Sequence, residues 1–150
     1  MNKEIIIRNY IYSDKKELLQ ILSLNIPKYF AEEEIGDFEI YLEKYIEDFF
    51  VIEHNKMLIG CGGINYKNDK SIGVISWDII KPEYQGKSIE KKLLEYRLEL
   101  IHSQKSINKI IVRTSKQAYK FYEKCGFKLL EIKENYWAEG FDLYYMVFNN

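Results

Sequence analysis

Residues 77–94, WDIIKPEYQGKSIEKKLL, contain the change from strand to helix on which the predicted fold is built. An apolar strand reaches Ile80, and Pro82 ends it, because proline has no N–H to donate to a neighbouring strand. A short polar loop from Gln85 to Ser88 then leads into a helix. Where a loop opens into a helix, free backbone N–H groups and the positive end of the helix dipole attract an anion. The stretch therefore predicts a strand–loop–helix unit with an anion-binding loop.

The helix after this loop has an apolar stripe that includes one arginine. Residues three or four positions apart share one face of a helix. The spacing therefore predicts a single buried face on this helix. Its expected members are Ile89, Leu93, Tyr96, Arg97 and Leu100.

A second motif follows the first at a distance that suits one helix and one strand. Residues 112–115, VRTS, lead to Ala118 and then to FYEKCGF at residues 121–127. Together the two motifs resemble those of the GNAT N-acetyltransferase superfamily, in which a Gln/Arg-x-x-Gly-x-Gly/Ala loop binds acyl-CoA and a late strand precedes Leu/Phe-Tyr-Glu-Lys-x-Gly-Phe. The resemblance covers roughly residues 47–150 and implies an N-acetyltransferase that uses acetyl-CoA.

Three positions depart from the family pattern. Gln85 matches it, but Ser88 and Glu90 stand where the family has Gly or Ala, and Ser115 stands where it has Asn. A carboxylate about 4 Å from a diphosphate would cost about 1 kcal/mol in water and roughly 4 kcal/mol at an effective dielectric of about 20. We therefore expect Glu90 to point to solvent. A relative that binds acyl-CoA without turning it over stays an open alternative.

Apolar periodicity along the chain predicts the element order β-α-α-β-β-β-α-β-α-β-β in a single domain, residues 1–150. The expected strands cover residues 5–7, 49–53, 57–66, 72–80, 107–112, 127–132 and 141–148. Gly60, Gly62 and Gly63 predict a β-bulge or a close backbone approach within the third strand. The order predicts an α+β fold with a mixed, mostly antiparallel central sheet flanked by helices, which is the GNAT-like arrangement.

Polar residues mark the expected helix starts. The pair Ser13-Asp14 is typical of an N-cap for the first helix. Residues 114–117, TSKQ, have the spacing of a capping box for the short helix that ends near Gly126. Tyr136 and Trp137 are expected in the segment that joins the last two strands.

The composition, 47% hydrophobic and 30% charged, is that of a globular protein. A formal net charge of -1 gives no electrostatic reason to bind nucleic acid or an anionic membrane. We expect a cytoplasmic protein, since the sequence has no apolar run of bilayer length and no signal-peptide core. Cys61 and Cys125 lack metal-site spacing, so free thiols and no metal are expected. His54 and His102 have no nucleophile partner in the sequence, which disfavours a hydrolase triad.

The family resemblance implies acetyl-CoA as co-substrate and assigns its contacts. The pantetheine arm is expected to pair with the backbone of residues 78–80 like an added strand. The backbone N–H groups of residues 85–90 are expected to hold the pyrophosphate. The predicted cofactor-binding residues are Ile79, Ile80, Gln85, Gly86, Lys87, Ser88, Ile89, Glu90, Thr114, Ser115 and Ala118.

Tyr122 and Asp78 are the predicted catalytic residues. Tyr122 occupies the position of the family's proton-donor tyrosine. Asp78 is the candidate base, because a carboxylate is uncommon in an apolar strand; a water chain and an ordinary hydrogen-bonded Asp stay as alternatives. Strand alternation predicts two faces, one with Val74, Ser76, Asp78 and Ile80 and the other with Ile75, Trp77 and Ile79.

The acceptor site is expected where the first two helices meet the last hairpin, as in the family. Aromatic and acidic residues gather in both segments, which suits a small cationic amine. The expected contacts are Tyr29, Phe30, Glu33, Tyr136 and Trp137. Acids in the first turn of a helix also suit its dipole, and a peptide N-terminus or a protein lysine is the alternative acceptor. The sequence leaves open whether the protein is a monomer or a homodimer.

Overall fold

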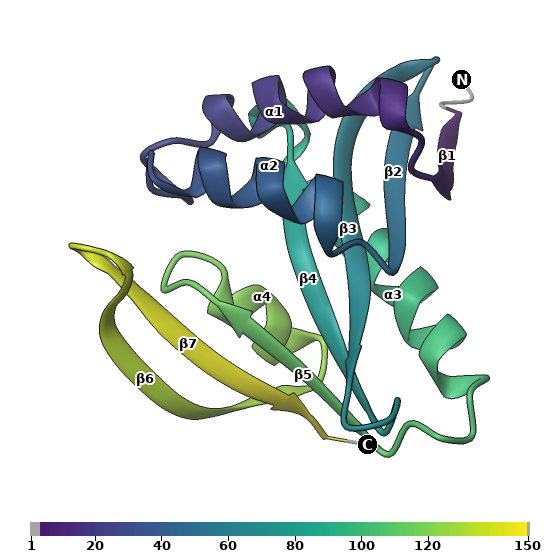
Figure 1. The fold of residues 1–150 in the computed structure, drawn as a ribbon, viewed down its shortest axis with the longest axis vertical. Helices are drawn as coiled ribbons and strands as arrows, with labels where there is room; N and C mark the ends of the chain where they lie inside the picture. Colours follow the sequence, from purple (N-terminus) through teal and green to yellow (C-terminus); the bar gives the residue numbers. More distant parts are fainter. Residues whose placement is uncertain (1–3, 150) are drawn as a thin grey trace.

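Within residues 4–149, which the computed structural model describes, seven strands form one sheet (Figure 1). Along the chain they are β1 (Ile5–Asn9), β2 (Asp48–His54), β3 (Met57–Lys67), β4 (Ile72–Ile80), β5 (Lys109–Thr114), β6 (Phe127–Ala138) and β7 (Phe141–Phe148). Their order in the sheet is β1-β2-β3-β4-β5-β7-β6. Strands β4 and β5 pair in parallel, and the other neighbouring pairs are antiparallel. The predicted mixed, mostly antiparallel sheet is confirmed.

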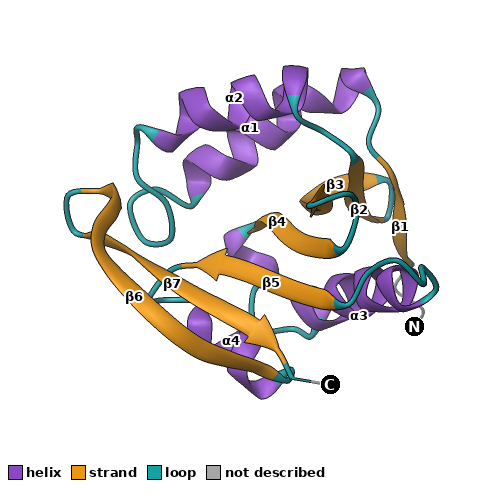
Figure 2. Cartoon of the chain, turned by 60° about the horizontal axis from the view of Figure 1, so that its bottom comes forward, coloured by secondary structure: helices purple, strands orange, loops and turns teal. Residues whose placement is uncertain are grey.

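In the described part of the chain, four α-helices cover the two faces of this sheet (Figure 2). Helices α1 (Lys15–Leu24) and α2 (Glu34–Lys44) lie on one face, and α3 (Ile89–His102) and α4 (Tyr119–Lys124) lie on the other. Short 3-10 turns, η1 (Tyr12–Asp14) and η2 (Pro82–Tyr84), come before α1 and before the loop that leads to α3. The predicted element order and α+β class are confirmed. No helix among residues 4–149 has both the length and the apolar character that crossing a membrane requires.

A β-bulge interrupts the pairing of β3 with β4 beside the cavity described below. Trp77 and Asp78 of β4 together lie opposite the single residue Gly62 of β3. Trp77 has a φ of 51°, a value that bulky residues rarely adopt. An extra residue in one strand bends the strand and re-aims the side chains after it. The glycines of β3 predicted a bulge or a close backbone approach; the extra residue of this bulge belongs to β4, and the close approach at the glycines is confirmed.

This bulge reverses the alternation of side chains along β4. Before it, Ile75 packs in the cluster on the side of α3 and α4. After it, Asp78 and Ile80 point to that same side, while Trp77 and Ile79 pack with α1 and α2. The expectation that Ile75 shares a face with Trp77 and Ile79 is wrong, because the inserted residue shifts the period-two pattern by one position.

Strands β4 and β5 separate toward the end of β4. Their parallel pairing covers residues 72–75 of β4 and 109–112 of β5. Past this point the two strands diverge (Figure 1). The last residues of β4, including Asp78 and Ile80, therefore border the place where the sheet opens.

Of two expected helix caps, one is confirmed in position only and the other is wrong. Asp14 is the N-cap residue of α1, but its carboxylate accepts the N–H of Ile11 and pairs with Arg8, and it makes no side-chain hydrogen bond to the helix. Thr114 ends β5, and α4 begins at Tyr119, too far along the chain for a capping box from Thr114. In both cases a strand or turn uses the polar residues that would otherwise cap the helix.

Three aromatic residues lie in other surroundings than expected. Tyr96 is 41% exposed, whereas Leu94 and Ile101 join the buried stripe of α3. Tyr136 and Trp137 belong to β6, which is longer than predicted, and not to the connection between the last strands. An irregularity in the pairing of β6 with β7 between Lys133 and Ala138 breaks the pattern from which the strand end was predicted.

Candidate active site

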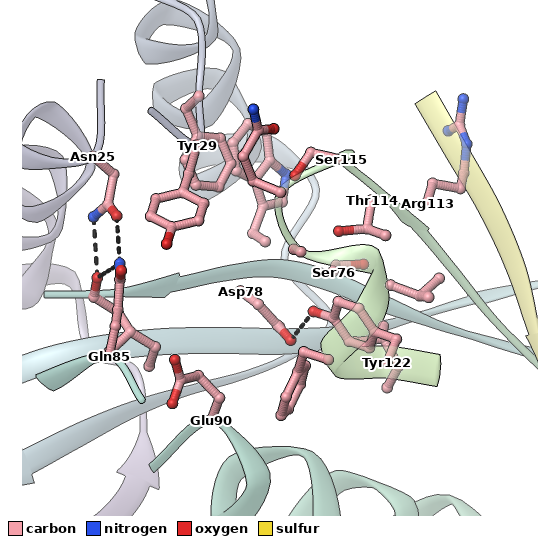
Figure 3. Close-up of a pocket in the computed structure, with 18 of the residues that line it drawn as sticks. Asn25, Tyr29, Ser76, Asp78, Gln85, Glu90, Arg113, Thr114, Ser115 and Tyr122 are labelled. Carbon is pink, nitrogen blue, oxygen red and sulfur yellow. Dashed lines mark hydrogen bonds between the residues drawn. The ribbon is translucent and has the colours of Figure 1, made fainter. Parts of the chain in front are cut away.

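A cavity of about 770 Å³ opens where β4 and β5 separate (Figure 3). The segment after α1, the end of β4, the loop before α3, the end of β5, α4 and β6 all contribute to its wall. The predicted site residues that line it are Tyr29, Phe30, Asp78, Ile80, Gln85, Gly86, Ser88, Glu90, Thr114, Ser115, Ala118, Tyr122 and Trp137. Most of the residues predicted from distant parts of the sequence thus share one cavity.

The other five predicted site residues lie elsewhere. Ile79 and Ile89 are buried in the two apolar clusters. Glu33 and Lys87 are exposed. Tyr136 lies on the outer part of β6, where its hydroxyl accepts a hydrogen bond from the Arg113 guanidinium.

Asp78 and Tyr122 meet through a hydrogen bond at the cavity wall (Figure 3). The Tyr122 hydroxyl donates to Oδ2 of Asp78 at 2.5 Å. Arg97, on α3, donates from Nη1 to Oδ1 at 2.6 Å and from Nη2 to Oδ2 at 2.8 Å. Both carboxylate oxygens are therefore engaged, and the base predicted from the sequence is one member of an Arg–Asp–Tyr network.

Burial and the neighbouring charges change the pKa values of Arg97 and Tyr122 in this network. The Arg97 side chain is 0% exposed and that of Asp78 is 17% exposed. Burial acts to lower the pKa of Arg97, but the charge of Asp78 and its hydrogen bonds raise that pKa above its ordinary value. Burial, followed by the negative charge of Asp78, raises the pKa of Tyr122 well above the ordinary value of a phenol. Tyr122 is thus held as a neutral hydrogen-bond donor.

Arg97 is the member of this network that was not predicted as a site residue. The signal was present, because an arginine within an apolar helical stripe needs a buried partner. What the sequence could not give was the partner, since the bulge at Trp77 turns Asp78 toward α3. The close approach expected at Gly62 is confirmed, because an added Cβ there would lie 2.6 Å from Oδ1 of Asp78 and 2.9 Å from Nη1 of Arg97.

The side chain of Gln85 holds the loop in place. Its Nε2 donates to Oδ1 of Asn25 at 2.7 Å and to the carbonyl of Ile80 at 2.9 Å. Asn25, buried at the end of α1, donates to the same carbonyl at 3.1 Å (Figure 3). The motif glutamine therefore ties the loop to α1 and β4 through its side chain.

The backbone of this loop suits an anionic group, with one opposing charge. Gly86 and Ser88 have φ values of 75° and 68°, and α3 begins directly afterwards. Lys91 and Lys124 also line the cavity. The expectation that Glu90 points to solvent is wrong, since its Oε2 accepts the N–H of Gly86 at 3.4 Å. The carboxylate of Glu90 instead lines the cavity.

The part of the wall expected to face an acceptor is aromatic and carries one acid. Phe30 and Trp77 stack with ring centroids 6.2 Å apart. Glu34, and not Glu33, belongs to the wall. It is 6% exposed, its Oε2 accepts the N–H of Ala31 at 2.9 Å, and burial raises its pKa. Helical spacing to the buried Phe38 was the signal that could have selected Glu34.

A family model for the acetyltransferase (GNAT) domain matches residues 46–129, more than half of the chain. The chain belongs to the GNAT acetyltransferase family. The matched residues of this GNAT domain include the loop before α3, Asp78, Arg97 and Tyr122. Glu34 and Trp137, on the side of the cavity where an acceptor is expected, lie outside the match, so family membership does not give the acceptor.

Three comparisons place the GNAT chain among known proteins. It is 28% identical over 96 residues to an uncharacterized N-acetyltransferase of Chlorobaculum tepidum, covering 64% of this chain and 58% of that relative's length. It is 27% identical to an N-alpha-acetyltransferase of Saccharolobus solfataricus, covering 96% of this chain and 92% of the relative. A crystal structure of an aminoglycoside 6'-N-acetyltransferase with coenzyme A has the same fold, with a TM-score of 0.75, 15% identity and 95% of each chain covered.

Proposed function

We propose that the protein is a cytoplasmic N-acetyltransferase that moves the acetyl group of acetyl-CoA directly to a primary amine of a small cationic molecule. One observation carries the proposal: a single cavity contains the anion-suited loop, the Asp78–Tyr122 pair and the aromatic wall with Glu34. Cofactor binding, acyl transfer and amine binding then share one space.

Residues of the loop before α3 are proposed to bind the cofactor. The N–H groups at Lys87 to Ile89 would hold the pyrophosphate at the start of α3, with Lys91 and Lys124 adding positive charge and Glu90, which accepts the N–H of Gly86, opposing it. The carbonyl of Ile80 already accepts two side-chain hydrogen bonds. The pantetheine arm would therefore pair with other backbone groups at the end of β4. When bound, acetyl-CoA supplies the thioester.

Direct transfer to the amine needs no protein nucleophile. Burial raises the pKa of Cys125, the thiol in the cavity wall, which supports a mechanism without an acyl-cysteine. A lysine-like amine has a pKa of about 10.4 and must lose a proton before attack. Both oxygens of Asp78 are engaged by Arg97 and Tyr122, so we propose that water takes this proton. Tyr122 would donate a hydrogen bond to the departing sulfur.

A peptide N-terminus is the second candidate acceptor. The N-alpha-acetyltransferase of S. solfataricus aligns over nearly the whole length of both chains, including the segments outside the family model. Glu34 would bind either the α-ammonium group of a peptide or a small cation, because both are positively charged before reaction.

Release of coenzyme A thiol from acetyl-CoA, measured across a panel of amines, tests the proposal. The panel contains polyamines and aminoglycosides, peptides with a free N-terminus, and N-terminally blocked peptides with one lysine. Turnover of the small cations supports the first candidate, and turnover of the free peptides alone supports the second. Binding of acetyl-CoA without thiol release on any amine would contradict both and indicate a non-catalytic acyl-CoA-binding protein.

A further inference from the structure

Arg97 lies behind the cavity wall, and its contacts leave the guanidinium little freedom. Its two terminal nitrogens both donate to Asp78. Nη1 also donates to the carbonyl of Gly63 at 3.0 Å, and Nε donates to the carbonyl of Leu93 at 3.3 Å. A planar guanidinium held by two carbonyls presents its remaining N–H groups in one orientation. Asp78 is therefore fixed from behind by a group that does not line the cavity.

Oδ2 of Asp78 has two donors, Nη2 of Arg97 and the hydroxyl of Tyr122. If the hydroxyl hydrogen turns to another acceptor in the cavity, Oδ2 keeps the hydrogen bond from Arg97. The carboxylate oxygen is then not left unpaired in a buried site, which would otherwise be costly. Arg97 thus makes the hydrogen of Tyr122 available without disrupting the network.

We propose that Arg97 is a positioning residue for acyl transfer: its two-point contact holds the charged Asp78 carboxylate directed at Tyr122, so that the Tyr122 hydroxyl keeps one orientation at the cavity wall. The role of Arg97 in turnover rests on the proposed acetyltransferase function. The inference that Arg97 stabilises the charged form of Asp78 rests only on the contacts between the two side chains.

The groups around Asp78 come from every element packed against it. Arg97 contacts it from α3 and Tyr122 from α4, while the thiol of Cys61 in β3 packs on the other side of the sheet, where burial and then the charge of Asp78 raise its pKa. Burial raises the pKa values of Tyr122 and of Tyr41 on α2. Cys125 adds to this rise at Tyr122, and the charge of Arg97 acts against it at Tyr41. Among these described groups Arg97 is the cation, so its removal leaves the Asp78 carboxylate without a compensating charge.

The pH dependence of kcat tests this role. In Arg97→Met, a partly buried carboxylate without its cation takes up a proton more readily and then holds the Tyr122 hydroxyl less firmly, so kcat should fall more steeply toward low pH than in the wild type. The double variant Arg97→Met with Asp78→Asn should lose this added dependence, because Asn does not titrate. Arg8→Met removes a similar pair far from the cavity and should leave the profile unchanged. A profile of Arg97→Met that parallels the wild type would overturn the proposal.

Carbon-13 NMR of the Asp78 carboxyl gives a readout that needs no turnover. The signal, assigned with Asp78→Asn, should report proton uptake at a higher pH in Arg97→Met than in the wild type. If Arg97→Met does not fold, Arg97→Lys, which keeps the charge but not the two-point contact, should move the signal in the same direction by less. Equal titration in variant and wild type would overturn the proposal, even if thiol release succeeds. A titration shift without thiol release would contradict the proposed function and leave the charge assignment standing.

Discussion

The protein contains two arginine–aspartate pairs with nearly the same geometry and different surroundings. Arg8 donates to the two carboxylate oxygens of Asp14 at 2.9 and 3.0 Å. Arg97 donates to those of Asp78 at 2.6 and 2.8 Å. The Arg8 side chain is 31% exposed, whereas Arg97 is completely buried. Surface pairs contribute little to stability, but a buried pair that loses one partner leaves an uncompensated charge.

The further partners of each pair differ even more. Asp14 also accepts the backbone N–H of Ile11, and Arg8 also donates to Glu53, so this pair joins β1 to η1 and to β2. Asp78 accepts the hydroxyl of Tyr122 at the cavity wall. The first pair anchors the start of the chain, and the second connects a buried helix to the candidate chemistry. The two pairs therefore differ in the third group, besides the arginine and the aspartate, that the aspartate contacts: the N–H of Ile11 in one and the hydroxyl of Tyr122 in the other.

The largest expected effect is that of removing this third partner. Tyr122→Phe should lower kcat and kcat/KM together by about 10²–10⁴-fold, because a donor to the departing sulfur acts chiefly in the transition state. Affinity for acetyl-CoA should barely change, since the ring is retained. Steady-state kinetics and direct binding measure the two effects. Tyr96→Phe, on the exposed side of α3, is the matched control, and a wild-type kcat for Tyr122→Phe would mean that the tyrosine only packs.

Unfolding in urea compares the two arginines directly. Arg97→Met should lower the free energy of unfolding by about 3–5 kcal/mol, because it removes a completely buried guanidinium from a partly buried carboxylate. Arg8→Met should lower it by about 1 kcal/mol or less, since Arg8 is 31% exposed and the buried Asp14 keeps the N–H of Ile11. Equal losses would show that burial does not separate the two pairs.

Two glycines offer a smaller test of the same site. Gly62→Ala should destabilise by about 1–3 kcal/mol, because the new Cβ would lie 2.6 Å from Asp78 and force the pair apart. Gly36→Ala is the matched control, since Gly36 lies in α2 with open space at its Cβ. It should stabilise by about 0.5–1 kcal/mol, because alanine favours a helix. Thermal unfolding measures both changes in stability, which should have opposite signs.

The smallest expected effect concerns two neighbouring acids at the start of α2. Glu34→Gln should raise the KM of a cationic acceptor about tenfold, or about 1.4 kcal/mol, whereas the exposed Glu33→Gln should leave it unchanged. In the wild type this KM should also rise as the pH falls, because burial raises the pKa of Glu34 and protonation removes its charge. A KM that does not respond to Glu34→Gln would leave this acid a purely structural role.

Much of this site could be predicted from the sequence because local patterns determine it. Proline, loop and helix spacing place the loop before α3, and the late motif places Tyr122 on α4. The glycines of β3 predict the close backbone approach. Each of these features depends on residues close together in the chain.

Other features of the site depend on irregularities of the backbone that the alternation of side chains along a strand does not predict. One inserted residue at Trp77 moves Asp78 to the side of α3, and only then can Arg97 reach it. The hydrogen bond between Glu90 and the N–H of Gly86 likewise depends on the folded loop. Of the three consecutive acids Glu32, Glu33 and Glu34, which one enters the cavity wall depends on how α2 packs against the sheet. Sequence patterns give the elements, and small irregularities in the elements decide which side chains meet.

A double-mutant cycle on kcat tests most directly whether Arg97 acts through Tyr122. The cycle compares the wild type, Arg97→Met, Tyr122→Phe and the double variant with one acceptor at one pH. We predict that Arg97→Met lowers kcat by about tenfold or more in the wild type but by less than about twofold when Tyr122 is already Phe, because residues that act as a unit are not additive. The same fold loss in both backgrounds would contradict this, and would make the buried Arg97–Asp78 pair a structural anchor like Arg8–Asp14.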